Sequence, residues 1–146
     1  MKLSTRTRYG TRALLELALR AGEGPVFLKD IAKSQQISLP YLEHLVTPLI
    51  SGGIIRSTKG PRGGITLARK PEDINLKEIT NLLEGSLAPV ECVDHADVCD
   101  RSGLCVTREV WGKLKEAIDE VLEKTTLKDL VDRQKKKRST PEMYYI

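Results

Sequence analysis

The chain has 146 residues, which is about the length of one domain. Its net charge is +4, and 40% of its residues are hydrophobic. It contains no run of 18 apolar residues, and its amphipathic N-terminus lacks the apolar stretch of a signal peptide. We therefore expect a soluble, cytoplasmic protein with no membrane span. A core of this size cannot bury a long additional helix on all sides, so a chain that contains one is expected to form an oligomer.

The charge is distributed unevenly. Residues 1–70 carry 12 Lys and Arg against 4 Asp and Glu, whereas residues 71–146 carry 12 against 16. A basic first half suits a polyanionic partner, and an acidic second half does not. The alternative interpretation is an uneven but merely solvated surface charge.

The first 51 residues predict three helices. Apolar residues spaced three and four apart predict an amphipathic helix from Thr5 to about Arg20, ended by glycines and a proline. Two shorter helices follow, over about 28–34 and 39–51, separated by a tight turn at 35–38. Ser38 is placed to cap the third helix, with Pro40 tolerated in its first turn.

The remaining elements are a hairpin and further helices. Two β-branched runs around Gly-Pro-Arg-Gly-Gly predict a two-stranded hairpin within 54–69. A helix is expected over about 74–84, and a long one begins at Val106, where an apolar stripe recurs to Val121 and requires a partner surface. Thr126 and Asp129 are spaced to cap a short final helix. We expect residues 132–146, which include the basic run RQKKKR, to form a mobile, solvated tail. The alternative interpretation of this run is a nucleic-acid-binding arm.

Three helices with a tight turn before the third, followed by a basic hairpin, form the layout of a winged helix-turn-helix. The predicted fold class is therefore mainly α with a small β-hairpin. The N-terminal half of the third helix would meet DNA. Tyr41 and Ser38 suit phosphates, His44 suits a purine acceptor, and Glu43 can accept from a cytosine amine or repel phosphate. The predicted DNA-binding residues on this helix are Ser38, Pro40, Tyr41, Glu43 and His44.

Lys59 and Arg62 in the predicted wing lie beside glycines that allow close backbone approach, so they suit phosphate or minor-groove contact. Each could also be a solvated side chain. A winged helix can serve as a protein-binding module, but such a module has less need of the positive charge in this half. The predicted partner is double-stranded DNA.

All three cysteines, Cys92, Cys99 and Cys105, fall within fourteen residues of an acidic loop. An odd number of thiols does not complete a disulfide framework, and neighbouring thiolates favour a soft metal or an iron–sulfur cluster. His95 in the same loop makes a Cys3His zinc site chemically reasonable, although the close cysteine pairs of structural zinc sites are absent. The remaining interpretation, three small buried apolar residues, fits poorly with so polar a loop.

The chain resembles the IscR-type family of winged-helix transcription regulators. The resemblance rests on MKLSTRTRYGTRALLELAL, ISLPYLEHLV, KGPRGG, the three cysteines, CVTREVWGKLKEAIDEVL and TLKDLV. It implies a homodimer built on the long helix. It also implies an iron–sulfur cluster held by Cys92, Cys99 and Cys105, with 2Fe-2S favoured over 4Fe-4S and the cluster easily lost in air. The expected function is control of iron–sulfur cluster biogenesis genes, with Glu43 taking part in discrimination between operator classes.

The sequence departs from the family at the fourth cluster ligand. Relatives use a histidine three residues past the third cysteine or an aspartate on the first helix, and Arg108 and Arg8 stand at these places here. The fourth ligand is therefore unknown. Candidates within the chain are His95, Asp94, Asp97 and Glu43, and the partner chain or solvent are the others.

Three alternatives remain. A regulator of the same fold could use its thiols directly, or respond to a partner protein, as members that control cysteine metabolism do. The chain could also be a zinc-stabilised interaction module. An enzyme is disfavoured, because Asp100 is nearer to Cys105 than His44 or His95 and no phosphate-binding loop occurs, so we expect no small-molecule substrate. The expected organisation is a DNA-binding domain (1–85), a cysteine-bearing loop (86–105), a dimerisation helix with a short final helix (106–131) and the tail (132–146).

Overall fold

The computed structural model describes residues 2–139. It begins with three helices, α1 (Thr5–Leu19), α2 (Leu28–Gln35) and α3 (Leu39–Ser51). The turn between α2 and α3 depends on Gln36, which adopts the left-handed conformation with φ 56°. Ser38 then caps α3, because its hydroxyl accepts from the amide of Tyr41 at 3.3 Å. The predicted helix-turn-helix is confirmed, with the predicted third helix matching α3.

A two-stranded antiparallel sheet forms the wing. Strands β1 (Ile55–Thr58) and β2 (Gly64–Leu67) pair with Ile55 opposite Leu67. Gly64 has φ 146°, and a Cβ there would lie 2.4 Å from the Val26 carbonyl oxygen. Only glycine therefore allows β2 to approach the segment before α2 this closely.

Helix α4 (Leu76–Leu83) follows the short 3-10 helix η1 (Pro71–Asp73) and closes the core. Asn75 and Glu78 form a reciprocal capping box at its N-terminus. The core is apolar and comes from α1 to α4, the wing and α7 (Leu127–Ser139). Its fully buried members include Leu14, Ile31, Leu42, Leu45, Leu49, Ile54, Ile74, Ile79 and Leu127.

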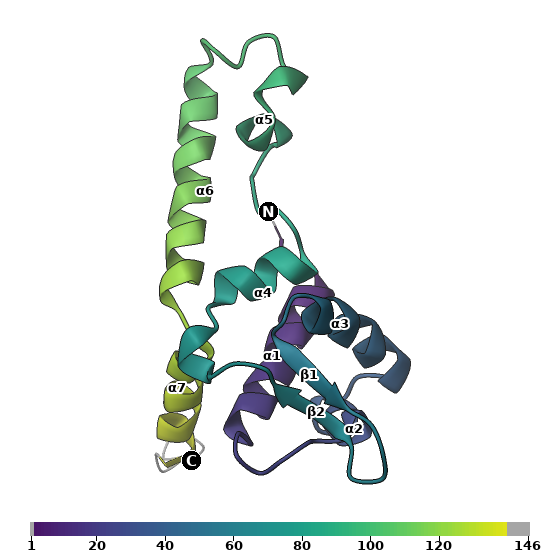
Figure 1. Cartoon of the computed structure of the whole chain (residues 1–146). Helices are drawn as coiled ribbons and strands as arrows, with labels where there is room; N and C mark the ends of the chain where they lie inside the picture. Colours follow the sequence, from purple (N-terminus) through teal and green to yellow (C-terminus); the bar gives the residue numbers. More distant parts are fainter. Residues whose placement is uncertain (1, 140–146) are drawn as a thin grey trace.

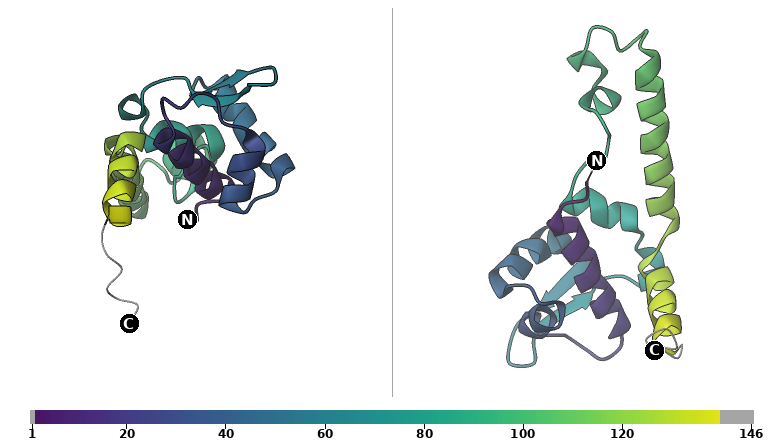
Figure 2. Two further views of the ribbon diagram at one scale, coloured as in Figure 1. Left: turned by 90° about the horizontal axis from the view of Figure 1, so that it is seen from below. Right: turned by 180° about the vertical axis from the view of Figure 1, so that it is seen from behind.

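An extended arm projects from this body (Figure 1). It comprises the segment with the short helices α5 (Glu91–Asp94) and η2 (Ala96–Val98), and the long helix α6 (Val106–Lys124). None of these three helices contains a buried residue. Figure 1 and the right view of Figure 2 place the arm at the end of the molecule opposite the wing.

The last helix differs from the prediction. The expected boundary at residue 131 between a short helix and a mobile tail is wrong, because α7 continues to Ser139. Thr126 and Asp129 cap it reciprocally, as predicted, and its buried residues Leu127 and Val131 pack on the body. Lys and Arg are good helix formers, and cations stabilise a helix C-terminus, so the basic run extends the helix. Residues 140–146 of the predicted tail lie outside the described residues.

Helix α7 packs against α1 and η1, so it lies with the helical body, whereas the sequence grouped it with the long helix. Among residues 2–139, no helix is both long and apolar enough to span a membrane.

Candidate nucleic-acid interface and cysteine segment

Helix α3 turns two faces in different directions. Leu42, Leu45, Val46 and Leu49 point into the core, with at most 5% of each exposed. This inward face was predicted and is confirmed. The opposite face, near the helix N-terminus, exposes the predicted contact residues Ser38, Pro40, Glu43 and His44. The core thus fixes the helix while its polar N-terminal end stays accessible.

Tyr41 is placed differently from the other predicted contact residues. It is half-buried, its hydroxyl donates to Thr5 Oγ1 at 2.9 Å, and its ring meets that of Tyr9 edge to face at 6.2 Å between centroids. In the free protein it therefore braces α3 against α1. A phosphate contact from Tyr41 would have to share this hydroxyl.

The wing carries Lys59 and Arg62 in its exposed turn, and both side chains are accessible. On α1, the guanidinium groups of Arg8 and Arg12 lie 6.0 and 5.3 Å from the Tyr9 ring centroid, and Arg12 also donates to Gln35 at 2.9 Å. Arg12 thus combines positive charge with a contact that joins α1 to α2, whereas Arg8 packs on Tyr9 of its own helix. The positive groups therefore lie on elements fixed by the core.

The three cysteines share one segment but do not form a metal-binding group. Cys92 and Cys105 are half-buried, Cys99 is exposed, and all three thiols are free. Over residues 2–139, no three Cys, His, Asp or Glu side chains come close enough together to hold a metal ion. The candidate fourth ligands His95, Asp94 and Asp97 are likewise exposed in this segment, and Glu43 lies on α3.

Cys105 lies at the start of α6. Its sulfur lies 3.1 Å from Thr107 Oγ1. This hydrogen bond, with backbone amides of the first helical turn, lowers the pKa of the Cys105 thiol. The N-terminus of α6 thus favours a thiolate at this position.

Arg108 holds the segment against α6. Its Nε donates to the Cys92 carbonyl at 2.8 Å, and its guanidinium also reaches the Ser102 carbonyl at 3.5 Å. Arg108 therefore connects Cys92 and Ser102, two separate points of the cysteine segment, by hydrogen bonds. The sequence identified Arg108 as a non-ligand but gave no signal for this contact.

Glu84, at the C-terminal end of α4, joins the base of the cysteine segment to α1. Its carboxylate accepts from the Ser4 amide at 3.2 Å and from the hydroxyls of Ser4 and Thr7 at 2.5 Å each. These bonds, first that from Ser4, lower the pKa of Glu84. Sequence reasoning missed this residue, because its partners are 77 and 80 positions away.

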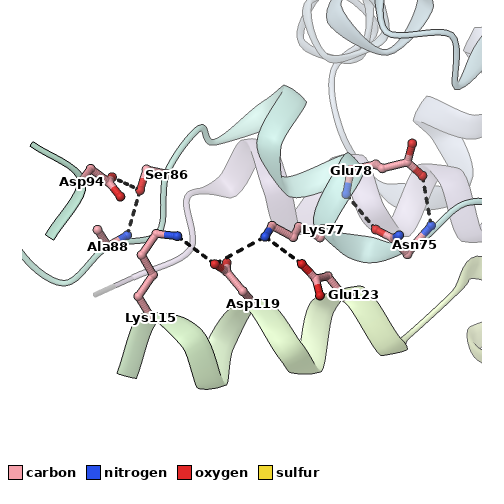
Figure 3. Close-up of polar contacts among 9 residues, drawn as sticks. All are labelled: Asn75, Lys77, Glu78, Ser86, Ala88, Asp94, Lys115, Asp119 and Glu123. Carbon is pink, nitrogen blue, oxygen red and sulfur yellow. Dashed lines mark hydrogen bonds and ion pairs between the residues drawn. The ribbon is translucent and has the colours of Figure 1, made fainter. Parts of the chain in front are cut away.

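Polar contacts also connect α4 to the arm (Figure 3). Lys77 on α4 lies 3.4 Å from Asp119 and 2.9 Å from Glu123 on α6, and Lys115 lies 2.8 Å from Asp119. Ser86 donates to Asp94 and accepts from the Ala88 amide, so it shapes the start of the cysteine segment. The ion pairs of Lys77 with Asp119 and Glu123 thus join α6 of the arm to α4 of the body.

The apolar stripe of α6 remains uncovered in one chain. Its members are 38–71% exposed, where Val106 is the most exposed and Leu114 the least. Trp111 beside them is 37% exposed. The sequence predicted that this stripe requires a partner, and no part of residues 2–139 buries it. The stripe consists of Val106, Val110, Leu114 and Val121.

A helix-turn-helix packs on an apolar core, its second helix exposes a polar face, and a hairpin follows. This arrangement defines a winged-helix DNA-binding fold. Residues 3–133 match the Rrf2 family model, described as iron-dependent transcriptional regulator. The chain belongs to the Rrf2 family of winged-helix transcription regulators, as its resemblance to IscR-type proteins predicted.

Curated relatives carry several regulator names. The chain is 47% identical to protein rrf2 of Nitratidesulfovibrio vulgaris, over 90% of this chain and 87% of that protein. It is 41% identical to the regulator CymR of Bacillus subtilis, covering 89% of each. It is 36% identical to the regulator IscR of Aliivibrio salmonicida, over 90% of this chain and 77% of that protein. The names of CymR and IscR and the description of the family model are those of transcription regulators, which confirms the non-enzymatic prediction.

Solved structures agree with this fold. The structure of T. potens IscR matches with a TM-score of 0.80 and 40% identity, covering 99% of this chain and 97% of that one. The structure of CymR, described as the global cysteine regulator of B. subtilis, matches with a TM-score of 0.77 and 39% identity, covering 91% and 98%. The predicted fold class is therefore confirmed, while relatives of two named kinds match to a similar extent.

Proposed function

We propose that the chain is a transcription regulator that binds double-stranded DNA in the cytoplasm. The observation that carries this proposal is the joint exposure of the α3 N-terminal face and the wing on one buried core. Ser38, Glu43 and His44 would meet base edges and phosphates in the major groove. Lys59 and Arg62 would contact the backbone or the minor groove beside it.

The active form in this proposal is a homodimer that packs α6 against its counterpart. A regulator that binds two half-sites needs two helix-turn-helix units at a fixed separation. The uncovered stripe from Val106 to Val121 supplies a self-complementary apolar surface for that purpose. Apolar side chains of Leu3, Ile118 and Leu122 line a groove along the same helix and would extend the contact.

The proposed input is an iron–sulfur cluster on Cys92, Cys99 and Cys105. The donor set fits such a group, because three thiols lie in one accessible segment and Cys105 favours its thiolate. The described conformation does not gather them, so binding requires the segment to rearrange. A bound cluster would neutralise the thiolates and cross-link the segment. The proposed targets are genes for iron–sulfur cluster biogenesis, in line with relatives named IscR.

The test of this input is protein purified without oxygen, examined by visible absorbance and by iron and sulfide assay. We expect charge-transfer bands and stoichiometric iron and sulfide, both lost in Cys92→Ala. The matched control is Ser102→Ala, a substitution in the same segment that removes no thiol. A colourless wild-type protein, or one containing zinc alone, would contradict the cluster.

A second candidate is a regulator of the same fold that holds no cluster and responds to thiol chemistry or a partner protein. Arg108 favours it, because its contacts with the Cys92 and Ser102 carbonyls hold the segment in place without a metal. The similar structure of CymR is described as that of the global cysteine regulator of B. subtilis, which is in line with this candidate. This candidate predicts colourless protein whose affinity for DNA changes with thiol oxidation or on addition of a partner protein.

A further inference from the structure

Helix α7 ends in a dense group of positive charges. From residue 133 to 139 there are five basic residues and no acid, and their side chains are exposed. The nearest acid along the helix, Asp132, pairs with Lys128 at 2.8 Å on the preceding turn. The group consists of Arg133, Lys135, Lys136, Lys137 and Arg138, and we call it the α7 cluster.

The α7 cluster is fixed to the DNA-binding body. Leu127 is fully buried and Val131 is 4% exposed, and both belong to the same core as the recognition helix α3. The capping box of Thr126 and Asp129 fixes the start of the helix. The positive charges thus lie on the continuation of a helix whose first turns are anchored in the core. Figure 1 and the right view of Figure 2 place the end of α7 and the tip of the wing at the same end of the molecule, away from the cysteine segment.

A groove with basic residues lies at the same body, between the end of α1, strand β2 and η1. Its volume is about 670 Å³, and it is lined by Arg20, Arg69 and Lys70, with Asp73 as the acid among them. Arg69 pairs with Glu78 at 2.9 Å and Arg20 lies 3.6 Å from Glu16, whereas Lys70 is exposed. Strand β2 connects the wing to this groove, and η1 connects it to α7, which packs against η1.

We propose that the DNA backbone is also bound beyond the helix-turn-helix, along a positive track that runs from the wing through this groove to the α7 cluster. This proposal rests on the proposed DNA-binding function and adds a second contact surface to it. A duplex carries closely spaced phosphates, and lysines that neutralise them release condensed counterions. Such contacts position the protein on the duplex and carry no sequence information. The track would therefore raise affinity equally for operator and unrelated DNA.

The test compares two double variants that lower the net charge by the same amount. Lys135→Gln/Lys137→Gln alters the α7 cluster, and Lys113→Gln/Lys124→Gln alters exposed lysines of α6 in the arm. Binding is measured against salt concentration for a duplex that the wild-type chain selects from a random pool, and for an unrelated duplex. The α7 variant should lose at least about tenfold in affinity for both duplexes at 0.1 M salt. Because the proposed dimer carries two copies of each lysine, its salt dependence should fall by up to about four in log–log slope. The arm variant should keep the wild-type slope.

Two further measurements separate the possible failures. Arg62→Gln in the wing removes one contact from each chain of the proposed dimer, so it should lower the slope by about two if the chain binds DNA as proposed. Wild-type protein that binds no duplex would overturn the proposed function together with the track. If Arg62→Gln lowers the slope while the α7 variant matches the arm variant, the track alone is overturned. Hydroxyl-radical footprints should lose protected backbone positions in the α7 variant and retain those at the recognition helix, and an unchanged footprint would contradict the track.

Discussion

The winged-helix body and the arm are stabilised by different interactions. Every buried apolar residue of the described chain lies within residues 13–83 or 127–131, and none lies between 84 and 126. The body therefore gains its stability from burial within one chain. The arm keeps its helix through backbone hydrogen bonds and polar links such as Lys77 with Asp119. The arm, by contrast, contributes no residue to the buried core, and its apolar stripe stays exposed within one chain.

The largest expected effect comes from a matched pair of leucine substitutions in the two regions. Leu45 on α3 is 1% exposed, so Leu45→Ala should lower the free energy of unfolding by about 2–5 kcal/mol. Leu104 in the cysteine segment is 94% exposed, so Leu104→Ala should change it by less than about 0.5 kcal/mol. Urea denaturation followed by circular dichroism measures both. Equal losses would show that the arm shares the core's stability.

The next effect concerns the proposed homodimer and leaves the fold of each chain intact. Val110 on the α6 stripe is 51% exposed, and Val98 in the cysteine segment is 50% exposed. Val110→Glu would bury a charge between two copies, so the dissociation constant of the dimer should rise about tenfold to a hundredfold. Val98→Glu should leave it unchanged. Analytical ultracentrifugation measures both, and a Val110→Glu protein that remains fully dimeric would move the interface away from this stripe.

The smallest effect tests the link between body and arm at Glu84. Its hydrogen bonds from Ser4 and Thr7 lower the pKa of its carboxyl below the ordinary value of 4.5, so ionisation stabilises the fold. This contribution is fully present above pH 4.5, where the unfolded chain is also ionised, and is lost as the pH falls through the lower folded pKa. Glu84→Gln should therefore cost about 1 kcal/mol at pH 7 and progressively less in acid.

Thermal unfolding at several pH values measures this difference. Glu91→Gln, an exposed glutamate of the cysteine segment, is the matched control and should show no such pH-dependent difference from wild type. A Glu84→Gln difference that stays constant between pH 7 and pH 3 would mean that the charge of Glu84 does not stabilise the contact.

The sequence alone determined most of the body. Helical spacing located α1 to α4, and Ser38 identified the start of α3, because capping and amphipathic periodicity are local properties of the chain. The predicted inward residues of α3 are buried for the same reason. The cysteine spacing identified a thiol-rich segment, and the stripe on α6 identified a surface that needs a partner.

Only the tertiary structure decided how distant residues are used. It placed Tyr41 against Thr5, Glu84 against Ser4 and the Arg108 guanidinium on the Cys92 carbonyl, none of which follows from spacing along the chain. It also turned the predicted tail from 132 to 139 into the end of a helix anchored by Leu127. The physical reason is that a side chain's hydrogen-bond partner, and the burial that fixes a helix end, depend on which segments the core brings together.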